Sequence, residues 1–270
     1  VTHNHWFRGS LEGIQTLHLA KMIPLRSRLS WNMFSQVTMP ARLEQRALDA
    51  PAASVEKVKS GKKLSRAAYN GFLTQLRSWI ARLHPVDTGK TVWGDYATTH
   101  TYSDAEATAK SQAIREFAAN VKPDRLIDLG CNSGDYSVAA LEGGAKYVIG
   151  FDFDHRAVDL AFSRAQEQKL NFLPLWLDAA NPSPNQGWRQ AERRGFAERA
   201  NADALIALAF EHHLAIGRNI PLQDVVDWLI SLAPAGIIEF VPKNDSTVQQ
   251  MLALREDIFP DYTEEAFENA

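Results

Sequence analysis

Residues 125–136, RLIDLGCNSGDY, constrain the fold of this chain more than any other segment. An apolar run ends at Asp128, passes through Gly130 and Gly134, and continues into a stretch with helical character. An acid and glycines at a strand-to-helix turn are typical of α/β sheets whose backbone approaches a nucleoside. A second carboxylate, Asp152, follows eighteen residues after Gly134. That separation suits a ribose-binding acid on the neighbouring strand.

Strand-like and helical stretches alternate from Arg125 onward. The expected strands are residues 125–129, 147–151, 172–177, 203–209 and 236–241, and the expected helices lie near 135–142, 155–168, 221–233 and 246–255. This alternation predicts the α/β class, with a doubly wound, mostly parallel, Rossmann-like sheet and right-handed crossovers. Ligands of such sheets bind beyond the carboxyl ends of the strands.

Residues 1–90 have helical signals and little strand signal, so we expect a helical N-terminal region ahead of a core at residues 91–270. Apolar residues at spacings of three and four predict an amphipathic helix, and they are Tyr69, Phe72, Leu73, Leu76, Trp79, Ile80 and Leu83. A further helix is expected within residues 101–121, with Ser103 as its cap and Glu106 as the capping-box partner.

The charges of the two regions differ in sign. Residues 1–90 hold 14 Lys and Arg against 5 Asp and Glu, a net charge of +9. The remainder holds 15 against 27, a net charge of −12, and the two sum to −3. The first interpretation is a solvated basic face, and the alternative is a region that steers an anionic substrate or partner. No basic run is interleaved with aromatic residues, so the sequence does not indicate a nucleic-acid partner.

Cysteine content and hydropathy favour a cytoplasmic protein without a membrane partner. Cys131 is the only cysteine, so no internal disulfide can form and a reducing compartment is expected. No apolar run has the length of a membrane span, and the start, VTHNHWFRGS, does not resemble a signal peptide. The oligomeric state is not indicated.

The order of the strand ends resembles that of class I S-adenosylmethionine-dependent methyltransferases. The matching segments are DLGCNSG, GFDFD and LPLWLDAANPSP. More narrowly, the chain resembles the NoeA-like nodulation-protein group in WGDYATTHTYSDAEATAK, LDAANPSPNQGWRQAER, LAFEHHLAIGRNIPL and IIEFVPKNDSTVQQMLALREDIFPDYTEEAFE. The resemblance implies an enzyme that transfers a methyl group from S-adenosyl-L-methionine to an undetermined acceptor. We expect a small-molecule or carrier-bound acceptor, which is anionic if the basic region attracts it.

Two features depart from the methyltransferase pattern. Asn132 replaces the middle glycine of the loop, and asparagine tolerates unusual backbone angles, so we expect the loop shape to be preserved. The superfamily sheet normally has seven strands, whereas this chain predicts five. The last two strands of the sheet are therefore expected to be missing, as in a truncated chain.

The resemblance assigns donor-binding roles to the glycine loop and to the acid before it. Gly130, Cys131, Asn132 and Gly134 would allow close approach of the methionine moiety, whose carboxylate suits the following helix N-terminus. Asp128 would accept from the donor's ammonium, directly or through water. The alternative for Asp128 is a buried acid that caps backbone amides.

The next two strand ends are expected to bind the adenosine. Asp152, beside Phe153, would accept from both ribose hydroxyls, whereas Asp154 is expected to cap the helix that follows. Asp178 would accept from the adenine amino group, with Leu177 and Ala179 as apolar walls; the alternative is a solvent-facing aspartate.

An aromatic cluster precedes the core, and it comprises Trp93, Tyr96, His100 and Tyr102. Trp93 and Tyr102 are the candidates for a lid over the donor. The alternative is an apolar seam between the helical region and the sheet.

The catalytic candidates follow the fourth strand. We expect that strand to deliver Glu211, His212 and His213 to the rim of the sheet, where either histidine could act as a base. A structural role for these histidines is an equal alternative. Adjacent strand residues face opposite ways, and no other spacing suggests ligands, so no metal site is expected. Glu239 is expected to form a structural ion pair with Lys243.

A second class of function stays open. The expected loss of two strands favours a non-catalytic, methyltransferase-like module that binds a nucleoside, or nothing, and recruits a partner.

Overall fold

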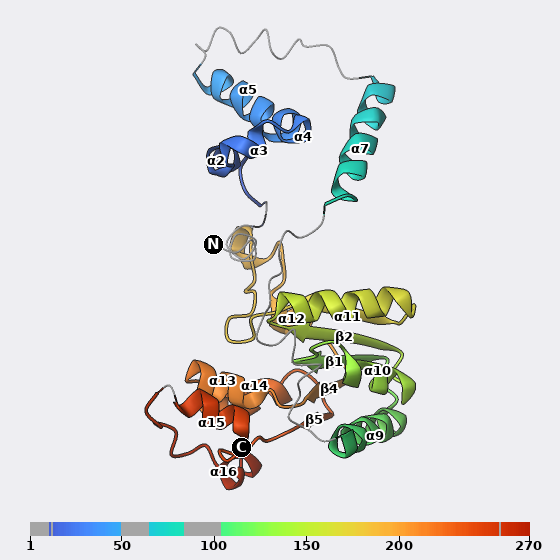
Figure 1. Ribbon diagram of the computed structural model, residues 1–270, viewed down its shortest axis with the longest axis vertical. Coiled ribbons are helices and arrows are strands. Elements are labelled where there is room, and N and C mark those ends of the chain that lie inside the picture. The colour runs from blue at the N-terminus through green and yellow to red at the C-terminus, as the bar shows by residue number, and fades with distance from the viewer. Residues whose placement is uncertain (1–10, 12, 50–64, 84–103, 254) are drawn as a thin grey trace. The chain divides into compact units, whose positions relative to one another are not determined.

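The computed structural model describes residues 11, 13–49, 65–83, 104–253 and 255–270, drawn in colour in Figure 1. The chain divides into two compact units, Val1–Val86 and Asp87–Ala270. The expected domain boundary at residues 90 and 91 lies outside the described residues, as do Ser103, Trp93 and Tyr102.

The described part of the first unit is helical, as predicted. Its elements are α2 (Thr16–Met22), α3 (Leu25–Arg28), α4 (Trp31–Met33), the π-helix η1 (Phe34–Thr38), α5 (Met39–Leu48) and α7 (Arg66–Ile80). The amphipathic pattern corresponds to α7, whose first turn is capped because the Ser65 hydroxyl accepts from the Ala68 amide at 3.2 Å.

The second unit contains one parallel sheet with the strand order β3-β2-β1-β4-β5. The strands are β1 (Arg125–Leu129), β2 (Tyr147–Asp152), β3 (Phe172–Trp176), β4 (Ala204–Ala207) and β5 (Gly236–Ile238). The predicted Rossmann-like α/β fold is confirmed, with shorter fourth and fifth strands than expected. The order reverses between β1 and β4, which is the topological switch point where such sheets bind ligands.

Helices of the second unit follow the predicted alternation. They are α9 (Asp104–Val121), α10 (Asp135–Glu142), α11 (His155–Glu167), the 3₁₀ helix η3 (Trp188–Gln190), α12 (Phe196–Arg199), α13 (Glu211–Arg218), α14 (Leu222–Ile230), α15 (Ser246–Ala253) and α16 (Glu264–Glu268). The sequence reasoning missed α12, α13 and α16. Of these, α13 matters most because it contains both catalytic candidates.

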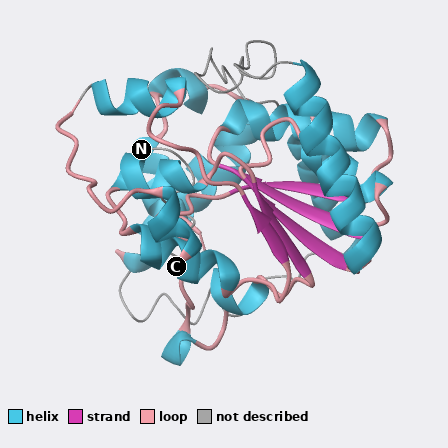
Figure 2. Ribbon diagram, turned by 90° about the horizontal axis from the view of Figure 1, so that it is seen from below, coloured by secondary structure: helices cyan, strands magenta, loops and turns pink. Residues whose placement is uncertain are grey.

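Two separate apolar cores flank the sheet, which Figure 2 shows in magenta among the cyan helices. Ile127 and Leu129 of β1 join a core with residues of α13, α14 and α15. Leu126, one position away, joins the other core with residues of α9, α10 and α11. Successive strand side chains point to opposite faces, so both faces of β1 are buried.

The helices among the described residues are all too short or too polar to cross a lipid bilayer.

Candidate functional site

A pocket of about 930 Å³ opens at the carboxyl ends of the strands, within the second unit. Three strand ends contribute to one wall through Gly130, Asp152 and Asp178. The rest of the lining comes mainly from α9, α13 and the segment after β5. The volume lies in the upper part of the range for small-molecule and cofactor sites.

The glycine loop after β1 has the backbone shape that its sequence predicts. Gly130 and Asn132 have left-handed φ angles of 80° and 46°, so asparagine does preserve the loop. The loop is tied to the neighbouring strand because the Gly130 and Cys131 amides donate to the Phe151 carbonyl at 2.8 and 3.0 Å. Gly130, Cys131 and Asn132 all line the pocket, and their role in donor binding stays a prediction.

Asp128 and Gly134 lie behind the residues that line the pocket, so a contact of Asp128 with the donor would have to run through water. Neither belongs to the pocket lining. Asp128 is 3% exposed and accepts from the Ser137 hydroxyl at 2.5 Å. Gly134 is the N-cap of α10 with a φ of 88°, and a Cβ there would lie 2.5 Å from Phe172 Cε1. Both residues therefore shape the loop from behind.

Asp152 occupies the position expected of a ribose ligand. Its Oδ2 accepts from the Asn132 amide at 2.9 Å and its Oδ1 from the Asp154 amide at 2.8 Å. An ionised carboxylate has about four acceptor sites, so acceptor capacity remains on the pocket side. Burial, as the largest cause, raises the pKa of Asp152. Asp154 caps α11 as predicted, since its Oδ1 accepts from the Arg156 amide at 2.8 Å.

The end of β3 supplies the expected third acid. Asp178 lines the pocket together with Leu177 and Ala179, and Arg218 Nη2 lies 3.6 Å from its Oδ1. Phe153 also lines the pocket and is 55% exposed, with the Arg218 guanidinium 5.6 Å from its ring centre. Arg218 was missed because α13 was missed. In that helix it lies on one face with Leu214, one turn earlier.

The two histidines lie on a helix, which corrects the prediction that the fourth strand carries them. β4 ends at Ala207, Ala209 turns the chain with a φ of 47°, and α13 begins at Glu211. His212 and His213 occupy its first turn with ring centres 4.2 Å apart, and both line the pocket. The argument that strand neighbours face opposite ways therefore does not apply. The described residues contain no group of three His, Cys, Asp or Glu side chains that could hold a metal ion.

Glu239 pairs with Lys110, which corrects the expected pairing with Lys243. Lys110 Nζ of α9 lies 2.6 Å from Glu239 Oε1, and the Ala209 amide donates to Glu239 Oε2 at 3.0 Å. Lys243 instead lies 2.8 Å from Asp257 Oδ2. Lys110 was not predicted as a pocket residue, and no local sequence pattern marks it as one.

Burial changes the protonation of two groups in opposite directions. Burial raises the pKa of Asp128 from 3.8 to about 7. The Ser137 hydrogen bond opposes this increase, and the nearby charges of Asp152 and Asp135 add smaller increases. Burial lowers the pKa of His213 from 6.5 to about 3, with a further contribution from His212. His213 is therefore neutral at pH 7 and a weak proton acceptor.

These shifts predict opposite effects of pH on stability. Between pH 3.8 and about 7 the folded state binds more protons at Asp128, so that group lowers the free energy of unfolding as pH rises. Between about pH 3 and 6.5 the unfolded state binds more protons at His213, so that group raises the free energy of unfolding as pH rises.

Relative to wild type, Asp128→Asn should become more stable as pH rises from 4 to 7, and His213→Gln should become less stable. The difference in the free energy of unfolding between each variant and wild type should change by up to about 1.4 kcal/mol per pH unit. Urea unfolding at pH 4, 5, 6 and 7 measures both. Parallel curves for the two variants would contradict the assignment.

The following similarities to known proteins were found. The family model for ribosomal protein L11 methyltransferase (PrmA) matches residues 106–181. The chain is 50% identical over 275 residues to nodulation protein NoeA of Rhizobium meliloti (strain 1021), covering 100% of this chain and 56% of that protein. It is 28% identical over 125 residues to ribosomal protein L11 methyltransferase of Shewanella sp. (strain ANA-3), covering 40% and 43%. The chain thus spans about half the length of the curated relatives it matches.

Solved structures show weaker similarity. Podospora anserina methyltransferase PaMTH1 bound to SAH has 15% identity and a TM-score of 0.36, over 66% of this chain and 71% of that one. A putative RNA methyltransferase, PH1948 from Pyrococcus horikoshii, has 17% identity and a TM-score of 0.38, over 66% and 77%. Because these scores are low, the observed sheet order carries the assignment of the fold.

Proposed function

We propose that this chain is a member of the NoeA-like group of class I S-adenosylmethionine-dependent methyltransferases, which binds S-adenosyl-L-methionine and transfers the methyl group to a nucleophilic acceptor. One observation carries the proposal: Gly130, Asp152 and Asp178, from three adjacent strand ends, line the same pocket. When bound, the donor supplies a methyl group on a cationic sulfonium, which a nucleophile can attack directly.

The pocket residues fit this donor. Asp152 retains acceptor capacity for ribose hydroxyls, because a carboxylate has about four acceptor sites and backbone amides do not fill all of them. Phe153, Leu177 and Ala179 offer apolar surface for a base, and Asp178 lies beside them as an acceptor. A Cβ at Gly130 would lie 3.0 Å from the Phe210 side chain, so this position has no room for a larger residue. A glycine here lets the backbone itself line the pocket.

The chain's main contribution to the reaction would be alignment of the two reactants. A base is needed only for an acceptor that must lose a proton. His212 is the first choice, because the lowered pKa of His213 makes that residue a poor base at pH 7. In addition to Asp152 and Asp178, the Lys110–Glu239 ion pair places two charged groups in the pocket lining.

For the methyl acceptor we propose only a chemical class. The net charge of +9 in residues 1–90 supports an anionic small molecule or an anionic carrier-bound acceptor. The cytoplasmic location likewise stays a prediction, supported by the single cysteine.

Calorimetric titration with S-adenosyl-L-methionine tests the proposal. We expect saturable binding of one donor per chain, and a rise in melting temperature that grows with donor concentration. NAD is the matched control, since it also carries an adenosine. The NAD-binding loop has a third glycine where this chain has Ser137, so NAD should not bind. Absence of donor binding would contradict the proposal.

Binding by itself does not distinguish an enzyme from a non-catalytic module. Incubation with methyl-labelled donor and fractions of bacterial lysate should label an acceptor in the wild type. Donor binding without any labelled product would instead support the recruiting module.

A further inference from the structure

A buried carboxylate lies beside the pocket and has no part in the donor contacts described above. Glu211, the first residue of α13, is 0% exposed. A buried carboxylate is costly unless hydrogen bonds compensate for its lost hydration. Each oxygen of Glu211 therefore needs a hydrogen-bond donor.

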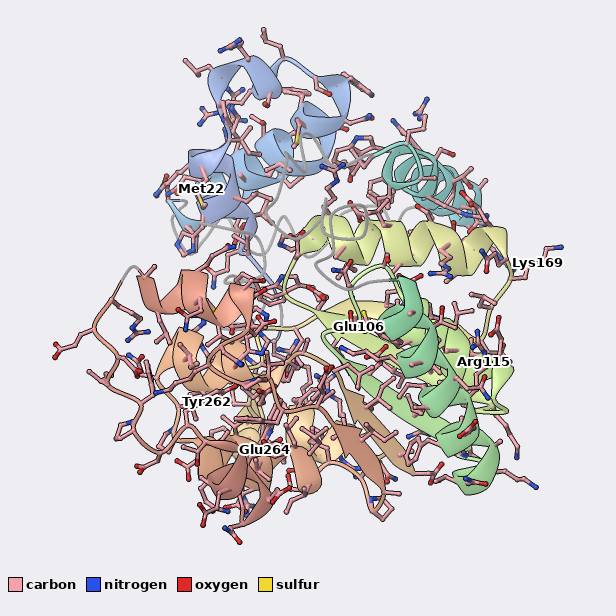
Figure 3. All side chains as sticks on the ribbon, turned by 60° about the horizontal axis from the view of Figure 1, so that its bottom comes forward. Met22, Glu106, Arg115, Lys169, Tyr262 and Glu264 are labelled. Atoms are coloured by element: carbon pink, nitrogen blue, oxygen red, sulfur yellow. The ribbon has the colours of Figure 1, made fainter. Side chains whose placement is uncertain are left out.

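One oxygen of Glu211 is well satisfied by a distant part of the chain. Oε1 accepts from the Val241 amide at 2.9 Å and from the Tyr262 hydroxyl at 2.6 Å. Tyr262, labelled in Figure 3, is 4% exposed, and its hydroxyl also lies 2.7 Å from the Val241 carbonyl oxygen. Burial, and then the neighbouring Glu211, raise the pKa of Tyr262, so it remains a donor.

The other oxygen of Glu211 faces a histidine nitrogen. Glu211 Oε2 and His212 Nδ1 are both buried and, within the described residues, neither has a hydrogen-bond partner. They lie 3.6 Å apart, slightly beyond hydrogen-bond length. Buried polar atoms in native proteins are nearly always paired, and catalytic hydrogen bonds are often long in ligand-free structures. A shift of a few tenths of an ångström would satisfy both atoms.

This pairing has a chemical consequence. Neutral histidine carries its proton on one ring nitrogen and a lone pair on the other. Donation from Nδ1 to Glu211 therefore leaves Nε2 of His212 as the proton acceptor. His212, although only 2% exposed, is one of the residues that line the pocket.

We propose that Glu211, held by Tyr262 and the Val241 amide, is a positioning residue that fixes His212 in the Nδ1-protonated tautomer, so that Nε2 can accept a proton from the methyl acceptor. Acceptors that suit this arrangement are hydroxyls and protonated amines, which must lose a proton. The transfer of a proton from the methyl acceptor to His212 rests on the proposed function, whereas the tautomer of His212 does not.

Nitrogen-15 NMR of the full chain with labelled histidine tests the proposal at neutral pH. His212→Gln identifies the signals of His212, which should show the Nδ1-protonated tautomer in the wild type. Glu211→Gln should invert it. The Val241 and Tyr262 donors hold the amide oxygen at the Oε1 position, so the amide NH₂ faces Nδ1, which must then accept. Glu167→Gln, an exposed change on α11 outside the pocket lining, should leave the tautomer unchanged.

The outcomes separate this proposal from donor binding. Glu211→Gln should bind S-adenosyl-L-methionine within about twofold of wild type by calorimetry, a change well below 1.4 kcal/mol. Loss of donor binding in the wild type would overturn the proposed function and leave the tautomer result standing. An Nε2-protonated His212 in the wild type, or the same tautomer in Glu211→Gln, would overturn the positioning role. The wild-type spectrum decides the question even if Glu211→Gln does not fold.

Discussion

Asp152→Ala is expected to weaken binding of S-adenosyl-L-methionine by at least about 100-fold. Hydrogen bonds to a charged group contribute ~1.5–3 kcal/mol each, and two ribose hydroxyls would lose their acceptor. The substitution also removes the acceptor of the Asn132 and Asp154 amides, which tether the glycine loop and the end of β2. Calorimetric titration of wild type and variant under the same conditions measures the change.

Two further variants make this result specific. Asp152→Asn retains one acceptor oxygen but points an NH₂ at a backbone amide, so its affinity should lie between wild type and Asp152→Ala. Asp159→Ala removes an exposed carboxylate of α11 that does not line the pocket, and it should bind normally. Folded Asp152→Ala with an affinity within threefold of wild type would contradict the ribose assignment.

Gly134→Ala is expected to lower the stability of the second unit by about 2–5 kcal/mol. A left-handed backbone costs a non-glycine residue ~1–2 kcal/mol, and the new Cβ would lie 2.5 Å from the ring of buried Phe172. Overpacking of this kind costs typically ~1–3 kcal/mol. The melting temperature should fall by about 5–15 °C, as measured by calorimetry.

The steric part of this effect can be separated from the backbone strain. Gly144→Ala, at a φ of 109° with nothing within 4 Å of its Cβ, adds only backbone strain and should cost less. Phe172→Leu removes the ring that the Gly134 substitution would meet. The double variant Gly134→Ala with Phe172→Leu should therefore be more stable than the sum of the two single effects. Strict additivity would show that the contact with Phe172 is not the cause.

The sheet was predictable because its strands are short apolar runs with clear interruptions between them. Gly143 and Gly144 end α10, and Asp154 caps α11, so local chemistry marked those boundaries. α13 was not predictable in the same way, because only three residues separate it from β4 and its N-cap is Phe210, which has no capping side chain. No cap signal therefore marked a helix start after the expected strand at residues 203–209.

The candidate site was predictable where backbone position determines it. Asp152 and Asp178 line the pocket because adjacent parallel strands end at one edge. Asp128 shows the limit of this reasoning. Its strand position was correct, but its side chain turns toward Ser137 and away from the pocket. Pairs such as Lys110 with Glu239 join residues more than a hundred positions apart, and no local pattern reports them.

The division of the apolar interior into two cores bears on how relatives of this chain can diverge. The core built with α9, α10 and α11 supports the glycine loop after β1, and the PrmA model covers most of this part at residues 106–181. The core that contains α13, α14 and α15 supports the helix that brings His212 and His213 to the pocket, and the match to NoeA includes this part because it covers the whole chain. That second core also packs against Leu177 and Ala179, the expected apolar walls for adenine, so substitutions in it reach both sides of the pocket. Divergence of the helix that carries the two histidines should therefore be limited to substitutions that keep the packing of Leu177 and Ala179.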